Sequence, residues 1–254
     1  MQSVLRSPKV MIVTGGSGGI GAAVSRLAAA EGYAVCVGYL NHPDAAAEVL
    51  CLLRQSGATA MAVRVDVAIE DDVVRMFNEV DATLGRVTAL VNNAGILRRQ
   101  CRVEDMDRAR IEQVFATNVI GSFICAREAV RRMSTKRGGS GGAIVNVSSR
   151  ASRLGSAGEY VDYAASKAAI DTLTIGLAKE VAAEGIRVNA VAPGIIDTPI
   201  HASGGDPGRL ERLREMIPMK RGGTPQEVAK AILWLLSDEA SYTTGATIDV
   251  SGGR

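Results

Sequence analysis

The sequence predicts an α/β protein built on one doubly wound, seven-stranded parallel sheet with helices on both faces. Short runs rich in β-branched residues alternate with longer amphipathic stretches along the whole chain. Hydrophobic residues make up 47% of the sequence but aromatic residues only 4%, so the core must be aliphatic, as in a buried parallel sheet. The 254 residues contain no evident linker or internal repeat, and we expect a single domain over residues 1–254.

The expected elements follow from the period of the hydrophobic pattern. Right-handed crossovers between successive strands then limit the topology to a doubly wound sheet. We expect helices at 19–31, 43–56, 70–84, 104–134, 163–184, 208–216 and 225–237. We expect strands at 9–14, 34–39, 61–67, 88–92, 143–148, 186–192 and 246–250.

Composition excludes several classes of protein. The formal net charge of +2 is too balanced for a nucleic-acid or membrane surface, so neither partner is expected. Cys36, Cys51, Cys101 and Cys125 are scattered and no histidine cluster accompanies them, which argues against a disulfide framework and a metal site. The N-terminal stretch has no apolar core typical of a signal peptide, and no apolar run is long enough to span a bilayer. We therefore expect a cytoplasmic protein.

A glycine-rich loop, 14-TGGSGGIG-21, follows the first expected strand and opens the first expected helix. The pyrophosphate of a dinucleotide needs close backbone approach and free N–H groups at a helix N-terminus, where side chains would be in the way. The position of the loop favours this reading over an ordinary glycine-rich turn. The candidate cofactor residues in the loop are Gly15, Ser17, Gly18, Gly19, Ile20 and Gly21.

The ends of the next strands add further cofactor candidates. An acidic residue after the second strand would bind the adenosine ribose of NAD, whereas Tyr39, Leu40 and Asn41 carry no carboxylate that would repel the extra phosphate of NADP. We therefore expect NADP in preference to NAD, although no arginine stands there and His42 fits a surface turn equally well. Asp66 and Val67 end the third strand and are placed to meet the adenine. Asn93, Ala94 and Gly95 form a turn against which a flat ligand could lie, but an ordinary turn would read the same.

The stretch 160-YVDYAASKAA-169 contains a candidate catalytic pair. Tyr163 and Lys167 stand at i and i+4, so one helical face presents both, whereas four residues after Tyr160 comes Ala164. A free tyrosine has a pKa near 10 and is a poor base at neutral pH. We expect the lysine ammonium and the positive nicotinamide ring to lower the tyrosine pKa, so that the phenol can donate and accept protons. A solvated helix face is the alternative.

Six motifs taken together resemble the short-chain dehydrogenase/reductase family, in the order in which that family carries them. The resemblance covers essentially the whole chain and is greatest to the sugar dehydrogenase and 3-oxoacyl-carrier-protein reductase branches. It implies a Rossmann fold and an NAD(P)-dependent oxidoreductase that acts on a small-molecule carbonyl or secondary alcohol. The motifs are TGGSGGIG, NNAG, Asn118 in 116-ATNVIGSF-123, Ser149 in 144-IVNVSSR-150, YAASK and 193-PGIIDT-198.

The resemblance also implies roles for individual residues. Tyr163 would exchange the proton, Ser149 would orient the substrate oxygen, Lys167 would also hold the nicotinamide ribose, and Asn118 would position a relay water. The nicotinamide would be bracketed by Pro193, Gly194, Ile196 and Thr198.

Two departures from the family pattern stand out. Ser149 precedes Tyr163 by 14 positions, which indicates an enlarged loop and keeps Ser148 as the second candidate for the substrate-orienting serine. Gly18 stands where many members that use NADP carry a basic residue.

Substrate selection should lie around 96–102, 150–162 and 196–217, and the glycine- and proline-rich segment 193–217 is expected to form a lid. The arginines in the first two stretches could attract an anionic substrate or simply keep the surface soluble; they are Arg98, Arg99, Arg102, Arg150 and Arg153.

Self-association is expected through the helices at 104–134 and 163–184, whose small and apolar residues lie on more than one face. The resemblance implies a homotetramer, or a dimer. Two other functions stay open. One is a catalytically silent protein that senses the nucleotide, and the other is a nucleotide-sugar epimerase, which the short chain after residue 193 disfavours.

Overall fold

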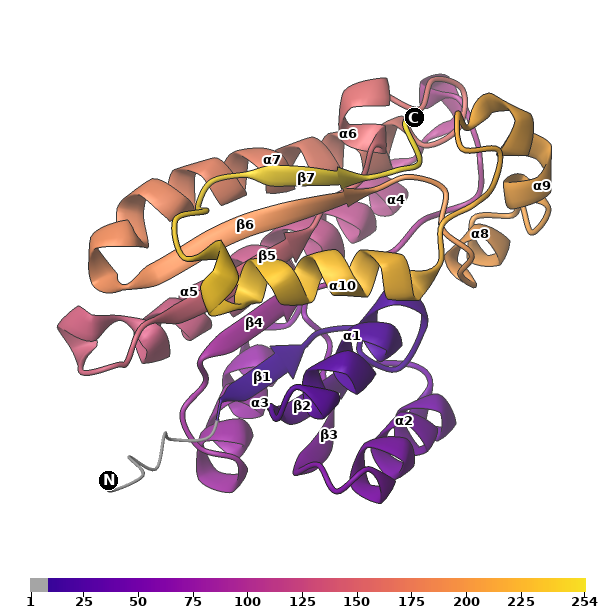
Figure 1. Cartoon of the computed structure of the whole chain (residues 1–254). Coiled ribbons are helices and arrows are strands. Elements are labelled where there is room, and N and C mark those ends of the chain that lie inside the picture. Colours follow the sequence, from indigo (N-terminus) through magenta and orange to yellow (C-terminus); the bar gives the residue numbers. More distant parts are fainter. Residues whose placement is uncertain (1–8) are drawn as a thin grey trace.

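The computed structural model describes residues 9–254, with only the main chain at positions 201 and 203. Its strands form one parallel sheet in the order β3-β2-β1-β4-β5-β6-β7 (Figure 1), which confirms the expected fold class. The expectation that the N-terminus is no signal peptide falls on residues 1–8, which lie outside the described residues. The strands are β1 Val10–Val13, β2 Ala34–Tyr39, β3 Ala60–Arg64, β4 Ala89–Asn92, β5 Gly142–Val147, β6 Ile186–Pro193 and β7 Thr247–Val250.

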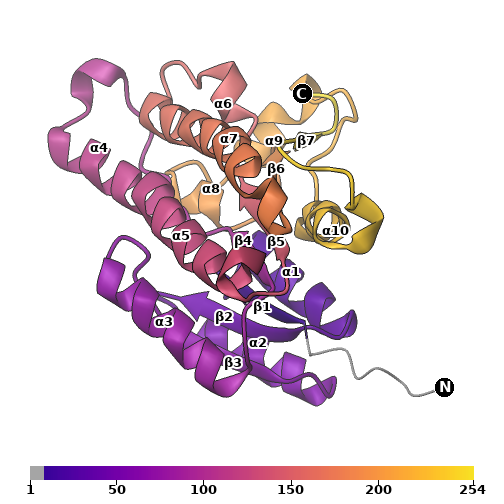
Figure 2. The same ribbon diagram turned by 90° about the vertical axis from the view of Figure 1, so that its left-hand side faces the viewer.

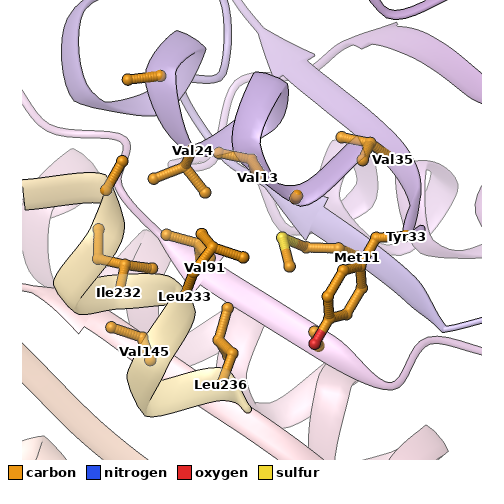
Figure 3. Close-up of a cluster of buried hydrophobic side chains, with 14 of the residues drawn as sticks. Met11, Val13, Val24, Tyr33, Val35, Val91, Val145, Ile232, Leu233 and Leu236 are labelled. Atoms are coloured by element: carbon orange, nitrogen blue, oxygen red, sulfur yellow. The ribbon is translucent and has the colours of Figure 1, made fainter. Parts of the chain in front are cut away.

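The central strands are buried on both faces, as their continuous apolar sequences require. All four residues of β1 and of β4 are buried, and β5 is buried from its second residue onward. Helices α1 (Gly19–Ala30), α2 (Pro43–Gln55) and α10 (Pro225–Leu236) cover one face. Figure 3 shows the aliphatic cluster under α1 and α10, with Val24 and Ile232 meeting the strand residues Val13, Val91 and Val145.

Helices α3 (Glu70–Thr83), α5 (Gly121–Met133) and α7 (Val161–Val181) lie side by side on the other face (Figure 2). Phe77, Cys125 and Ala178 bring one buried side chain from each helix into the second core cluster. The remaining helices are η1 Val103–Asp105, α4 Arg108–Phe115, η2 Ala116–Ile120, η3 Thr135–Arg137, α6 Ala151–Leu154, η4 Ala182–Glu184, α8 Ile200–Ser203, α9 Arg209–Leu213, η5 Arg214–Met216 and η6 Asp238–Ala240.

The expectation of one helix over 104–134 is wrong. A short 3-10 turn ends before Asp107, whose carboxylate accepts a hydrogen bond from Arg110 N at 2.7 Å and so caps a new helix. That helix then widens into a π-helix over η2 before α5 begins. The loop expected at 150–162 contains the short helix α6, and the segment between Pro193 and the helix expected at 208–216 contains α8. The helix expected at 208–216 is present as α9 and η5.

The third strand is shorter than the expected 61–67 and ends at Arg64. Asp66 Oδ1 accepts a hydrogen bond from Ala68 N at 3.0 Å, and Asp72 Oδ2 accepts one from Asp66 N at 3.0 Å. These side-chain bonds turn the backbone away from the sheet because they replace the strand partners.

The order of the strands creates a crevice between β1 and β4. The chain leaves β3 at one edge, passes through α3 and re-enters the sheet on the other side of β1. The carboxyl ends of β1 and β4 therefore send their loops in opposite directions, which is where doubly wound proteins bind ligands. Among residues 9–254, no helix combines the length and apolar character that a bilayer span requires.

The glycine loop is pressed against the end of β4 within this crevice. Asn93 Nδ2 donates hydrogen bonds to Thr14 O at 3.0 Å and to Gly15 O at 2.9 Å. Thr14 Oγ1 accepts hydrogen bonds from the main-chain nitrogens of Asn93 and Ala94, both at 3.0 Å. Gly15 adopts a left-handed conformation with φ of 62°, and a Cβ added at Gly21 would lie 2.2 Å from Gly15 O. This turn therefore leaves no space for a side chain at position 21.

We expect Gly21→Ala to destabilise the protein by about 1–3 kcal/mol, or more where the loop cannot shift, because the new methyl overlaps main-chain atoms. Gly18→Ala is the matched control, since Gly18 has an extended φ of −155° and an added Cβ meets no atom within 4 Å. Urea unfolding of both variants measures the difference. Equal stability of the two variants would contradict the tight packing of the loop.

Candidate functional site

Helix α7 presents Tyr163 and Lys167 toward the carboxyl end of β5, as the i, i+4 spacing predicts. Lys167 is 4% exposed, and its Nζ lies 5.6 Å from the centroid of the Tyr163 ring. Lys167 Nζ donates a hydrogen bond to Val147 O, the last residue of β5, at 2.7 Å. The lysine is therefore fixed inside the protein and does not belong to a solvated helix face.

Burial changes the acid–base behaviour of this lysine. Removal from water disfavours the ammonium and lowers the pKa of Lys167 to about 8, against a smaller opposing effect of the Asp171 carboxylate. The ammonium is consequently close to its titration point at neutral pH. A group in this condition can hold a charge for a ligand and also release a proton.

The protein groups alone do not produce the lowering of the tyrosine pKa that was expected from the lysine and the nicotinamide ring together. Burial raises the pKa of Tyr163, while the Ser149 hydrogen bond and then the Arg209 charge act to lower it. The desolvation cost of a phenolate inside the cavity outweighs both favourable contacts. Tyr163 is therefore a neutral phenol in the chain by itself, ready to donate a proton.

The two serines after β5 have different surroundings. Ser149 lines the cavity beside Tyr163, and its Oγ also accepts a hydrogen bond from Ala151 N at 3.1 Å. Ser148 is 2% exposed and donates from Oγ to Lys167 O at 3.2 Å. The Ser148 hydroxyl thus ties α7 to the end of β5, and the Ser149 hydroxyl is the one that reaches Tyr163.

Asn118 lies in the π-helix η2 with both amide atoms engaged. Its Oδ1 accepts from Ile96 N at 2.8 Å, and its Nδ2 donates to Ile96 O at 3.1 Å and to Ser166 Oγ at 3.0 Å. The side chain fixes the segment after β4 to α7, one residue before Lys167. A cofactor-side role for this amide is therefore indirect, through the position of these two segments.

Gly95 lies next to Lys167 and Asn118. A Cβ added at Gly95 would lie 3.5 Å from Lys167 Nζ and 3.4 Å from Asn118 Oδ1, so the turn after β4 passes close to both. Asn93 faces the cavity but uses its amide to hold the glycine loop. Ala94 is held through its main-chain nitrogen.

The glycine loop and the segment after β6 approach each other across the crevice. A Cβ added at Gly19 would lie 3.2 Å from Thr198 Cγ2. The N-terminus of α1 has no side-chain cap and no acidic residue in its first turn, which leaves its N–H groups and positive dipole for an anion. Ser17, Gly18 and Gly19 line a second hollow of about 340 Å³ at this end of α1.

The remaining predicted residues of the glycine loop and of the segment after β6 line the main cavity, which is described below. Ile20, Pro193, Gly194, Ile196 and Thr198 all line it. Gly194 is held against β7, because its N donates to Val250 O at 3.0 Å and a Cβ added to it would lie 2.8 Å from Ser251 Cα.

The structure adds one residue to the expected adenosine end of the crevice. Arg64 is the parallel neighbour of Tyr39, and its Nε donates a hydrogen bond to Leu40 O at 3.3 Å. The exposed Asn41 follows directly. The sequence at the end of β2 contains no arginine, whereas the register between β2 and β3 places Arg64 there from the next strand.

Asp66 and Val67 follow β3 at the same end of the sheet. One Asp66 oxygen is used in the turn to Ala68, and Val67 is buried against Gly121 at the start of α5. Val67 thus packs the turn against α5.

The main cavity has a volume of about 550 Å³, which is within the range of small-molecule sites. Tyr163, Ser149 and Lys167 line it together with residues from the segment 193–217, including Ile200, Leu213 and Met216. Its lining also holds a strong excess of positive charge. The cationic side chains are Arg150, Lys167, Arg209, Arg212 and Arg254, and the lining includes one carboxylate, Glu159.

Three of the arginines that the sequence offered for anion attraction, Arg102, Arg150 and Arg153, are held in ion pairs. Arg98 pairs with Gln113, and Arg102 with Glu104 at 2.7 Å. Arg150 and Arg153 both pair with Asp249, at 2.7 and 3.0 Å. Arg99 lies beside Gly205, and its main-chain oxygen accepts from Arg110.

Among residues 9–254, no three His, Cys, Asp or Glu side chains gather in a way that could hold a metal ion.

We expect Lys167→Met to stabilise the protein at pH 7, by up to roughly 3 kcal/mol, because it removes a buried ammonium whose pKa falls from 10.5 to about 8. Below pH 8 the lysine is charged in both states, so the folded chain bears the full cost. Between pH 8 and 10.5 the unfolded state binds more protons, and the parent gains stability as the pH rises. The advantage of the variant in urea unfolding should therefore shrink over that range. A pH-independent difference would contradict the lowered pKa.

Comparison with known proteins agrees with this geometry. The family model described as Enoyl-(Acyl carrier protein) reductase matches residues 15–254. The chain is 59% identical to "Uncharacterized oxidoreductase YgfF" of Escherichia coli (strain K12), over 96% of this chain and 99% of that protein. It is 40% identical to "Cis-4-hydroxycyclohexanecarboxylate dehydrogenase" of Sinomonas cyclohexanicum, over 96% of each chain. A crystal structure of a dehydrogenase/reductase from Sinorhizobium meliloti 1021 superposes with a TM-score of 0.90 at 34% identity, over 98% of this chain and 95% of that one. The chain belongs to the short-chain dehydrogenase/reductase family and is an NAD(P)-dependent oxidoreductase that acts on alcohol or carbonyl groups.

Proposed function

We propose that Tyr163 is the proton donor in reduction and the proton acceptor in oxidation, as the enzyme interconverts a small-molecule carbonyl compound and a secondary alcohol. The observation that carries this proposal is the meeting of Tyr163, Ser149 and Lys167 in one cavity beside the glycine loop. Each of these side chains has an ordinary structural explanation when taken alone. Their convergence at the carboxyl end of β5 has no such structural explanation.

Different side chains have different roles at the substrate oxygen. When bound, the nicotinamide supplies or accepts the hydride at the carbonyl carbon. Ser149 orients the oxygen by a hydrogen bond, and the Tyr163 phenol gives its proton to that oxygen in reduction. The Ser149 hydrogen bond and the Arg209 charge favour the phenolate that remains, and Lys167 would hold the nicotinamide ribose. Asn118 holds the turn after β4 and α7 in the register that this geometry needs.

The residues of the crevice fit a dinucleotide. Side chains at Gly15 and Gly21 would fill the space between the glycine loop and β4, and the start of α1 is uncapped. We propose that Gly15, Ser17, Gly18, Gly19, Ile20 and Gly21 hold the pyrophosphate. The adenosine would then lie along Tyr39, Leu40, Asn41, Asp66 and Val67. The nicotinamide would be held by Asn93, Ala94 and Gly95 and by Pro193, Gly194, Ile196 and Thr198, and its ribose by Tyr163 and Lys167.

We propose NADP as the preferred cofactor, with NAD as the second choice. No carboxylate follows β2, and the exposed Arg64 guanidinium bonds to Leu40 O at the position where a ribose phosphate would lie. An arginine there offers a planar donor set that suits a phosphate. Because Gly18 supplies no basic side chain, the proposed contact with the phosphate falls to Arg64.

We also propose self-association to a homotetramer, or to a dimer. Large apolar side chains are exposed on α4, η2, α5 and α7, where they would be covered by a second copy. They are Ile111, Ile120, Phe123 and Ile175, which are 40 to 52% exposed. The four cysteines are all free thiols, which supports the proposed location in the cytoplasm.

The segment 193–217 is proposed to act as a lid. It carries α8, α9 and η5, and it contributes Ile200, Leu213 and Met216 to the cavity wall. The alternative of a silent nucleotide sensor has no support in the comparisons, and the chain keeps all four side chains that catalysis needs.

We expect Tyr163→Phe to lower turnover by at least about 100-fold, because general acid–base catalysis contributes two to four orders of magnitude. Binding of NADPH, followed by fluorescence, should stay unchanged. The assay follows loss of NADPH or NADH with acetoacetyl thioesters, diketones, keto-sugars and cyclic ketones. Tyr242→Phe is the control, since that tyrosine is fully exposed. An active Tyr163→Phe enzyme would refute the assignment of the proton donor.

We expect Leu40→Asp to shift the ratio of kcat/KM from NADPH toward NADH by about tenfold or more, because a carboxylate there repels the phosphate and binds the ribose hydroxyls. Arg64→Gln should weaken NADPH binding and leave NADH binding nearly unchanged. If neither variant alters the cofactor ratio, the end of β2 does not read the ribose.

A further inference from the structure

The main cavity contains two arginines whose buried guanidinium nitrogens have no partner among the described residues. Arg209 is 7% exposed and its Nη1 makes no hydrogen bond. Arg254 also lines the cavity, and its Nη1 is equally buried and unpartnered. In the described part of the chain, only two other side-chain polar atoms share this condition, both of them carboxylate oxygens outside the cavity wall.

Arg209 is held in place by neighbours that leave one edge of its guanidinium open. Its Nη2 donates to Glu159 Oε2 at 2.6 Å, and its Cζ lies 5.1 Å from the centroid of the Tyr160 ring. Asp206 Oδ2 lies 3.8 Å from Nη1, which is too far for a hydrogen bond. The Tyr160 hydroxyl in turn donates to Gly204 O at 3.3 Å. Tyr160 is thus a positioning residue, and Nη1 remains a free donor on a fixed group.

The carboxylates around the cavity do not neutralise its cations. Asp249 pairs with Arg150, Asp206 and Glu159 pair with Arg212, and Glu159 also serves Arg209. Arg254 makes no ion pair among residues 9–254. Burial lowers the pKa of Arg254, and the Arg209 charge acts in the same direction, against an opposing effect of the Glu159 carboxylate. Two cations that line one cavity with little access to water are costly unless enough negative charge lies with them.

We infer that the substrate of the proposed reaction carries a carboxylate, which the free guanidinium edges of Arg209 and Arg254 bind while Tyr163 and Ser149 engage its carbonyl or hydroxyl group. Guanidinium donors suit a planar carboxylate. Arg209, Arg254 and Tyr163 line the same cavity of about 550 Å³, so one small molecule can reach all three. The inference rests on the proposed function for the position of the reacting oxygen. The carboxylate site itself stands on the arginines alone.

The first test is binding of an unreactive ligand to the enzyme loaded with NADP, by titration calorimetry. Cyclohexanecarboxylate should bind at least tenfold more tightly than cyclohexanecarboxamide, which has the same shape without the charge. Arg209→Met should remove most of this preference, and Arg209→Lys should retain part of it. Arg153→Met is the matched control, because Arg153 is half exposed, pairs with Asp249 and does not line the cavity. Equal binding of acid and amide by the parent enzyme would overturn the inference.

Arg254→Met is the second variant. Because Arg254 forms no ion pair among the described residues, its replacement leaves no carboxylate unpaired. This variant should therefore fold even if Arg209→Met does not. It should weaken cyclohexanecarboxylate at least fivefold and leave the carboxamide unchanged. Equal weakening of both ligands would indicate a change of cavity shape and would count against a carboxylate site.

Measurements of turnover test the carboxylate site and the proposed reaction separately. With NADPH, 4-oxocyclohexanecarboxylate should show a kcat/KM at least tenfold above that of 4-methylcyclohexanone, with the gain lost in the Arg209→Met and Arg254→Met variants. Fast reduction of the neutral ketone without any advantage for the acid would overturn the inference and leave the reaction intact. Arginine-dependent binding of the acid without turnover of any carbonyl would support the carboxylate site and refute the proposed reaction.

Discussion

The attachment of α7 to the end of β5 determines the rest of the site. Lys167 Nζ donates to Val147 O at 2.7 Å, and Ser148 Oγ donates back to Lys167 O at 3.2 Å. These two hydrogen bonds run in opposite directions between one strand end and one helical turn, and both are buried. Tyr163 stands one turn before Lys167, and Ser149 directly follows Ser148. The contact between the phenol and the serine is therefore a consequence of how the helix is attached to the sheet.

The same attachment carries a cost in stability. Burial of the lysine lowers its pKa to about 8, so at neutral pH the folded chain keeps an ammonium that would be more favourable in water. The compensating contacts are one carbonyl oxygen and the more distant Asp171 carboxylate. Destabilising burial of a charged group is characteristic of functional sites, because it shifts the pKa of that group. The aliphatic core clusters on both faces of the sheet supply the stability that allows it.

Features that depend on local spacing were predictable from the sequence, and features that depend on pairing across the sheet were not. The alternation of strands and helices gave the sheet, and the i, i+4 spacing correctly placed Tyr163 and Lys167 on one face. The break at Asp107 was missed because the apolar pattern continues through it, although an aspartate at a helix start is a capping signal. Arg64 was missed because it reaches the end of β2 from the neighbouring strand. The register Tyr39↔Arg64 would have been needed to find it.

The charge of the cavity likewise depends on contacts that only the folded structure reveals. Arginines in 96–102 and 150–162 stand out in the sequence, yet three of them are held in ion pairs, Arg102 with the nearby Glu104 and Arg150 and Arg153 with the distant Asp249. Arg209 and Arg254 are inconspicuous in the sequence and become important only because folding places both in one cavity wall, each with an unpartnered Nη1 atom. A guanidinium that is surrounded by partners contributes to structure, whereas a buried one with an open donor edge retains the capacity to bind. The unmet hydrogen bond, more than the count of positive residues, is what identifies where this enzyme can hold an anion.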